Sequence, residues 1–182
     1  MSIFFTSDTH FGHDAIRRNC NRPFADVQEM DRTLIDSWNC RVRQTDVVYH
    51  LGDFSYKACE DLLEYRRKLN GTIHFIRGNH DPQTEGLLES IFESVKDLSS
   101  IKVEGKRIVL CHYAMRVWDR SHLGSWHLYG HSHGKLPDDP LQLSLDVGVD
   151  CHNYHPISFQ ELKETMEIKM ELIANKKEDD AS

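Results

Sequence analysis

Short apolar runs alternate with longer amphipathic stretches along this chain. Short apolar runs of this kind are typical of strands buried in a sheet. The segments that we predict as strands are Ile3–Thr6, Asp46–Leu51, Thr72–Arg77, Ser100–Val103, Arg107–Cys111, His127–Tyr129 and Leu141–Val149.

Three other stretches repeat their apolar residues at helical spacing and are predicted as helices. Asp26 precedes the first of them as a plausible N-cap. Ser158 stands three residues before Glu161 at the start of the last, which is the signature of a capping box. Asn70 and Gly71 form a stop signal after the second helix. The predicted helices are Val27–Arg41, Lys57–Leu69 and Ser158–Ala174.

The order of these elements predicts an α/β layered fold. Strands and helices alternate in the first half of the chain, which favours parallel β-α-β units. The second half has more closely spaced strands, with a loop-like interruption at 113–125. We expect one domain over residues 1–175, followed by a polar and flexible tail at 176–182.

Composition excludes several classes of protein. With 182 residues, 28% charged and 39% hydrophobic, the chain has the make-up of a soluble globular domain. The net charge of -7 argues against an extended nucleic-acid-binding face, although a local basic pocket stays compatible with it. The start lacks a secretory signal, and no apolar run is long enough for a membrane helix. Five widely spaced cysteines fit reduced thiols, so a cytoplasmic location is expected.

Polar residues gather at the ends of five predicted strands. Ligands of open α/β sheets bind beyond the carboxyl ends of the strands, so these residues should share one site. Glycines beside several of them would allow the sharp turns that such a site requires. The residues are Asp8 and His10, Asp53, Asn79 within "GNHD", His112, and His131 and His133 within "GHSH".

These side chains form a donor set for metal ions. The spacing of Asp8 with His10, and of His131 with His133, puts both members of each pair on one side of an extended backbone. Four histidines, two aspartates and one asparagine are too many for one tetrahedral zinc ion. If one carboxylate bridges, the set supplies four contacts to each of two cations.

The order D-x-H, G-D, G-N-H-D, H, G-H-x-H resembles the calcineurin-like metallophosphoesterase superfamily, from about residue 3 to residue 158. The "SDTHFGH" opening and the small size are similar to its compact bacterial and phage members, which lack a separate capping domain. This resemblance implies an α-β-β-α sandwich of mixed sheets with the helices on the outside.

The resemblance also implies how the ligands are divided. Asp8, His10 and His133 would hold one metal, Asn79, His112 and His131 the other, and Asp53 would bridge the two. Nitrogen and oxygen ligands without thiolate favour Mn²⁺, Fe, Ni²⁺ or Zn²⁺, with Mn²⁺ our first expectation. A hydroxide held between two such ions would attack phosphorus in line with the leaving group.

Four further residues are candidates for catalysis or substrate binding. His80 resembles the histidine of the family that does not bind metal and that assists the leaving oxygen. Asp81 is predicted to orient the His80 imidazole and keep it protonated. His13 and Arg22 are predicted to contact the substrate phosphate. A helix position without a role is the alternative for His13, and a solvated surface position is the alternative for Arg22.

The remaining histidines and the aromatic loop have weaker assignments. Histidines 50, 74, 152 and 155 are predicted to be structural, on the basis of their positions in strands or in the "DCHNYHP" turn. Trp118 and Trp126 either pack in the core or clamp a nucleobase or acyl group.

Together these features predict a phosphodiesterase with two divalent metal ions and a small, nucleotide-like substrate. A phosphomonoesterase or protein phosphatase of the same superfamily is the alternative, and a DNA nuclease is disfavoured by the acidic balance. A metal-binding module without turnover also stays open, whereas a protein-binding scaffold would be expected to lack some of the ligands. The sequence does not determine the oligomeric state.

Overall fold

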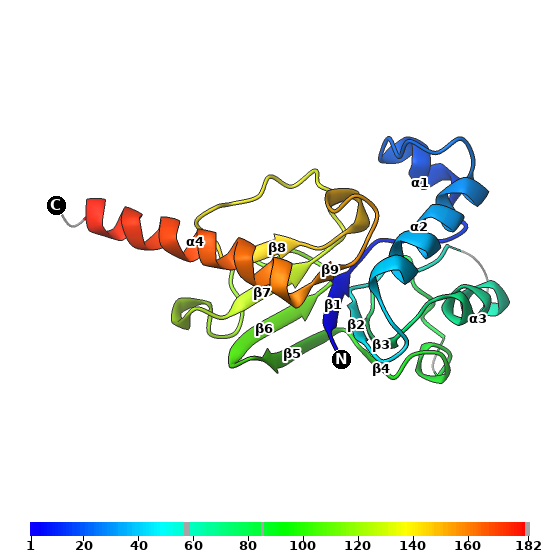
Figure 1. The fold of residues 1–182 in the computed structure, drawn as a ribbon, viewed down its shortest axis with the longest axis horizontal. Helices are drawn as coiled ribbons and strands as arrows, with labels where there is room; N and C mark the ends of the chain where they lie inside the picture. The colour runs from blue at the N-terminus through cyan, green and yellow to red at the C-terminus, as the bar shows by residue number, and fades with distance from the viewer. Residues whose placement is uncertain (57–58, 85, 181–182) are drawn as a thin grey trace.

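A computed structural model describes residues 1–56, 59–84 and 86–180 of the chain (Figure 1). The strands are β1 (Ile3–Thr6), β2 (Val47–His50), β3 (Thr72–Ile76), β4 (Ser94–Lys96), β5 (Leu98–Val103), β6 (Lys106–Cys111), β7 (Trp126–Tyr129), β8 (Ser144–Asp146) and β9 (Ile157–Ser158). The helices are α1 (Asp14–Asn19), α2 (Val27–Arg41), α3 (Cys59–Lys68) and α4 (Phe159–Asp179), with short 3₁₀ turns at Leu88–Ser90, Ser121–Leu123 and Val149–Cys151.

The first sheet has the strand order β4-β3-β2-β1-β9. Its first four strands are parallel, as the alternation of strands and helices predicts, and β9 joins β1 in the antiparallel direction. Side chains alternate across each strand. One face therefore packs against helix residues such as Met30, Leu34 and Trp38, and the other face, which includes Phe5, belongs to a second apolar cluster.

The second sheet has the strand order β5-β6-β7-β8. The β5–β6 pair is antiparallel, whereas β6, β7 and β8 run parallel. Ile108, Leu110 and Leu128 share a core with Phe5 of the first sheet. The two sheets therefore pack face to face around this apolar layer.

Helix α4 covers the second sheet, in orange and red in Figure 1. The Phe159 ring lies 6.1 Å from that of Trp126, and Lys169 Nζ donates to the Ser144 carbonyl of β8 at 2.7 Å. Helices α2 and α3 lie on the first sheet, so the four layers form the predicted α-β-β-α sandwich. The Ser158–Glu161 capping box at the start of α4 is confirmed.

Several boundaries differ from the predictions. Strand β8 is shorter than the predicted Leu141–Val149, and Gly148, beyond its end, forms an isolated bridge with Ser7. Helix α4 continues to Asp179, so residues 176–179 of the predicted tail are helical. The short elements α1, β4 and β9 were not predicted. The predicted start of the second helix, residues 57–58, lies outside the described residues.

The described cysteines, Cys20, Cys40, Cys111 and Cys151, are all free thiols, as expected. Among the residues that the structure describes, none of the helices combines the length and the apolar character that crossing a bilayer requires.

Candidate metal centre

The carboxyl ends of β1, β2 and β3 in one sheet and of β6 and β7 in the other meet at one side of the sandwich. A direct contact joins the two sheets there. The backbone N–H of His131, after β7, donates to both carboxylate oxygens of Asp8, after β1, at 2.9 and 3.1 Å. Residues separated by 123 positions in the sequence therefore share one site, as the strand-end argument predicts.

The backbone turns sharply at the site. Asp8, His10, Asp53, His131 and His133 all have positive φ, between 48° and 66°. This left-handed conformation costs a residue with a side chain about 1 kcal/mol or more, and it clusters at functional sites. Five of the seven predicted metal ligands therefore occupy strained positions that aim their side chains beyond the sheet.

Two glycines allow the backbone to approach the carboxylates. A Cβ added at Gly78 would collide with the Asp53 carboxylate, and one added at Gly130 would collide with the Ser7 hydroxyl and the Asp8 carboxylate. Neither clash is with the end of a long flexible side chain. The glycines beside the ligands are thus needed for space at these two positions.

The first group of donors consists of Asp8, His10 and His133, whose ligand atoms all lie within 4.8 Å of one another. The second consists of Asp53, His112 and His131, at the same spacing. Asn79 joins the second group, because its Oδ1 lies 3.1 Å from His112 Nε2. The structure therefore brings together all seven predicted ligands.

Asp53 lies between the two groups. Its Oδ2 is 3.5 Å from His10 Nε2 in the first group and 3.6 Å from His112 Nε2 in the second. Two ligands that each lie about 2.1 Å from a shared cation, at a near-tetrahedral angle, are roughly 3.4 Å apart. One oxygen of Asp53 thus has the spacing of a bridging ligand, while the other accepts the His80 backbone N–H at 2.9 Å.

One buried nitrogen atom without a hydrogen-bond partner indicates that the donors fit divalent cations. His10 Nε2 is fully buried and has no hydrogen-bond partner among the described residues. A buried nitrogen without a partner costs about 1–3 kcal/mol, so a ligand for it is expected. Burial also lowers the pKa of His10 and keeps its imidazole neutral, which is the form that binds metal.

The charges of the first group also fit a cation. Burial raises the pKa of the Asp8 carboxyl to about 8. Burial alone would lower the pKa of His133, but hydrogen bonds with Asp150 and Cys20 and the charge of Asp8 raise it to about 10. Both groups must lose a proton to act as ligands, so metal binding here should release protons.

Two histidines are oriented by hydrogen bonds to their second ring nitrogen. His112 Nδ1 donates to the Leu51 carbonyl at 2.7 Å, which leaves Nε2 without a proton on the side of Asp53, with its lone pair available to a metal ion. His133 Nδ1 lies 2.7 Å from Asp150 Oδ2, which leaves its Nε2 on the side of Asp8, 4.0 Å away. Such contacts fix the tautomer and the ring orientation of a metal ligand.

Asp150 and its role were missed by the sequence analysis. It follows β8 by four residues in the 3₁₀ turn, and no metal-site spacing in the sequence singles it out. Its partner Arg22 offered the one available signal, since an arginine followed by proline in a loop suggests a fixed position.

Arg22 has a different place from the one predicted. Its side chain is 0% exposed and bonds to both oxygens of Asp150 at 2.8 Å. The other acceptors are the Asp8 and Thr9 carbonyls and the Met30 sulfur. All five guanidinium N–H groups are used, which argues against the predicted contact with substrate phosphate.

Asp81 also differs from its prediction as the partner of the His80 ring. In the described residues its carboxylate accepts the backbone N–H groups of Asp53, Phe54 and Gly78, at 2.7 to 2.9 Å. Burial raises the pKa of this carboxyl to about 6, although these hydrogen bonds oppose the shift. Asp81 therefore holds the turn that carries Asp53, rather than the imidazole of His80.

His80 and His13 lie at the mouth of the site. His80 is exposed, and its ring centroid is 5.3 Å from that of His10 and 6.0 Å from that of His13. His13 stacks on Tyr56 at 3.9 Å with the rings 10° apart. The Tyr56 side chain, which the sequence analysis did not single out, is therefore a further group beside the site.

Five other histidines have structural partners. His50 contacts Thr9, His74 contacts Ser94, and His155 contacts Arg41. The rings of His127 and His152 bond to backbone carbonyls. Trp118 and Trp126 are buried in the apolar cluster that residues of both sheets and of α4 share, so packing is their role.

Comparison with known proteins agrees with this geometry. The family model described as the calcineurin-like phosphoesterase superfamily domain matches residues 1–139. The chain belongs to this superfamily. It is 38% identical over 166 residues to an uncharacterized protein of Methanocaldococcus jannaschii, with 86% of each chain covered.

Two further relatives extend the comparison. The gene 66 protein of Mycobacterium phage D29 is 24% identical and is covered over 90% of its length by 86% of this chain. A crystal structure of a protein of unknown function from Aquifex aeolicus has a TM-score of 0.70 at 23% identity, covering 90% of this chain and 98% of that one. That likeness establishes the shared fold.

Proposed function

We propose that this protein is a metal-dependent phosphodiesterase that hydrolyses a small, nucleotide-like phosphodiester with two divalent metal ions. The observation that carries the proposal is the position of Asp53. One of its oxygens lies at ligand spacing from a histidine of each donor group, and membership of the phosphoesterase superfamily supplies the reaction class.

Asp8, His10 and His133 would hold one ion, Asn79, His112 and His131 the other, and Asp53 both. When bound, the two ions would lower the pKa of a shared water and neutralise charge on the phosphate oxygens. Mn²⁺ is the metal that we propose first, with Fe, Ni²⁺ and Zn²⁺ as alternatives, because the donors are nitrogen and oxygen atoms.

The protein groups around the phosphate would divide the remaining work. His80 is exposed beside the donors and is anchored through its backbone N–H to Asp53, so its imidazole can reach a leaving oxygen and protonate it. The Asp81 carboxylate holds the same turn by accepting the backbone N–H groups of Asp53 and Gly78. His13, stacked on Tyr56, would contact the phosphate or its substituent.

The exposure of the site supports the diester preference. Asn79, His80 and His131 are exposed, so a phosphorus atom with a substituent on either side can approach them. A phosphomonoesterase or protein phosphatase is the second candidate, since the same donors suit a terminal phosphate. A protein-binding scaffold is disfavoured, because all seven donors are present and converge.

A hydrolysis assay tests the proposal. Purified protein would be stripped with EDTA, reloaded with Mn²⁺, Ni²⁺ or Zn²⁺, and assayed on bis(p-nitrophenyl) phosphate and p-nitrophenyl phosphate. We expect metal-dependent release of p-nitrophenol, faster from the diester. Faster release from the monoester would favour the second candidate. No release of p-nitrophenol from either substrate, together with no hydrolysis of cyclic nucleotides, would refute the proposal that the protein is an enzyme.

A further inference from the structure

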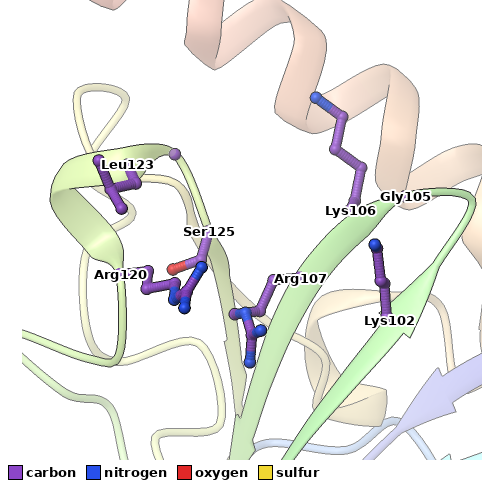
Figure 2. Close-up of a pocket in the computed structure, with 8 residues that line it drawn as sticks. Lys102, Gly105, Lys106, Arg107, Arg120, Leu123 and Ser125 are labelled. Atoms are coloured by element: carbon purple, nitrogen blue, oxygen red, sulfur yellow. The ribbon is translucent and has the colours of Figure 1, made fainter.

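A second hollow, of about 310 Å³, opens at the opposite end of the second sheet from the candidate metal centre (Figure 2). Its walls are the β5–β6 hairpin and the loop before β7. The residues that line it are Lys102, Gly105, Lys106, Arg107, Arg120, Leu123, Gly124 and Ser125. Figure 2 shows the side chains of Arg107 and Arg120 extending toward the same space below Ser125.

The charge of this hollow opposes that of the whole chain. Four of its lining side chains are cationic, in a protein whose net charge is -7. Asp119 is the carboxylate that pairs with one of them, Arg107, at 3.5 Å. Among the described residues, Lys102, Lys106 and Arg120 form no ion pair. Unpaired cations around a concave surface create a positive potential that attracts anions.

The nearby carboxylate of Glu104 does not neutralise the hollow. It lies in the β5–β6 turn, but it pairs with Lys163 of helix α4 at 3.5 Å. The Lys106 ammonium lies 5.8 Å from the centroid of the Trp126 ring, and Figure 2 shows this side chain pointing away from Arg107 and Arg120. The cations therefore keep an excess over the acids around them.

The loop that carries Arg120 is firmly built. Arg120 itself has a left-handed backbone, with φ at 58°, and its carbonyl accepts the N–H groups of Leu123 and Ser125. The Trp118 indole donates to the Ser125 carbonyl at 3.1 Å. A long cationic side chain at a strained position that favours glycine or asparagine indicates that its placement matters.

Strand β6 separates this hollow from the metal centre. Arg107 lies near the start of β6, and the ligand His112 directly follows its end. Five residues of extended strand span about 17 Å. A small ligand in the basic hollow would therefore not reach the candidate metal ions.

We propose that this hollow is a second, separate site that binds a small oligophosphate anion, such as a chain of two or three phosphate groups. Arg107 and Arg120 would grip phosphate oxygens through their planar N–H groups, and Lys102 would add a third positive charge. Ser125 also lines the hollow, and its hydroxyl donates to the Asp119 carbonyl. The volume suits a ligand of this size and excludes a folded macromolecule.

Isothermal titration calorimetry with sodium tripolyphosphate tests the proposal on the full chain. The protein would be stripped with EDTA and desalted, so that no metal contributes to binding. The test variant is Arg107→Gln with Arg120→Gln. The matched control is Arg32→Gln with Arg43→Gln, which removes the same charge at exposed positions elsewhere. Orthophosphate serves as the comparison ligand.

We expect the wild type and the control variant to bind tripolyphosphate with the same affinity. The affinity of the test variant should be lower by about tenfold or more. Orthophosphate should bind to the wild type more weakly than tripolyphosphate does. Metal-dependent hydrolysis should be unchanged in the test variant. If that variant does not fold, Lys102→Gln with Arg120→Gln replaces it, since both side chains are exposed. Equal binding by test variant and control, equal affinity for both ligands, or no binding by wild type would overturn the proposal.

Discussion

Asp150 offers a sharp test of how the first donor group is held. Its Oδ2 accepts the His133 Nδ1–H at 2.7 Å and also a hydrogen bond from Arg22, whose second bond is to Oδ1. Replacing Asp150 with asparagine keeps the size of the side chain but removes its charge and one acceptor. The substitution leaves the Arg22 guanidinium, which is 0% exposed, without its counter-charge.

Two effects of known size follow. Removing one partner of a buried ion pair typically costs 3–5 kcal/mol, and the retained amide oxygen of Asp150→Asn puts the expected loss at about 3 kcal/mol. Loss of the partner that orients a ligating histidine typically weakens metal binding about 10–100-fold. The second effect should act on the ion held by Asp8, His10 and His133.

Two measurements separate these effects. Urea denaturation of metal-free protein gives the free energy of unfolding, and competition with a chelating dye at a temperature where both proteins are folded gives the Mn²⁺ affinity. Asp97→Asn, at an exposed position, is the control. If Asp150→Asn has the same free energy of unfolding and the same Mn²⁺ affinity as the control, the contacts from Arg22 through Asp150 to His133 do not hold the site.

Three further predictions concern single residues. Asp53→Ala should lose both metal ions, measured by elemental analysis after reconstitution, and retention of either at full occupancy would contradict the bridging role. His80→Ala should keep both ions and lose about 10²–10⁴-fold in hydrolysis rate, so an empty site in this variant would mean that His80 is a ligand. Glu161 should contribute to stability only above acidic pH: burial alone would raise its pKa, but bonds from Arg41 and Ser158 lower it from 4.5 to about 2. Its contribution is therefore complete above about pH 4.5 and is lost as the pH falls toward 2, so the stability difference between wild type and Glu161→Gln should shrink from pH 6 to pH 2.5 in urea denaturation.

The donor set and the α/β layered fold could be predicted because local patterns carry them, whereas the α-β-β-α sandwich was implied by the family resemblance. Short apolar runs mark the strands, and the residues directly after them, such as Asp8 and Asp53, must lie beyond the edge of the sheet. The capping box at Ser158 is equally local. The short strands β4 and β9 could not be predicted, because two or three residues carry too little periodicity.

The roles of Arg22, Asp81 and Asp150 could not be predicted because long-range contacts determine them. Arg22 and Asp150 are 128 positions apart in the sequence. The Arg22 side chain, of a type that often binds phosphate, is instead buried and forms an internal ion pair with Asp150. Asp81 is three residues from Gly78 but 28 from Asp53, whose backbone it also binds. Sequence spacing identifies which residue types are available, and the fold decides which partner each one contacts.

Metal stoichiometry tests the central claim most directly. The protein would be stripped with EDTA, reconstituted with Mn²⁺ and freed of excess metal. Its manganese content would then be measured by inductively coupled plasma mass spectrometry. If the seven donors form a dinuclear centre around Asp53, two manganese ions per chain are expected, falling below one in Asp53→Ala. One ion or only traces in the wild-type protein would contradict it.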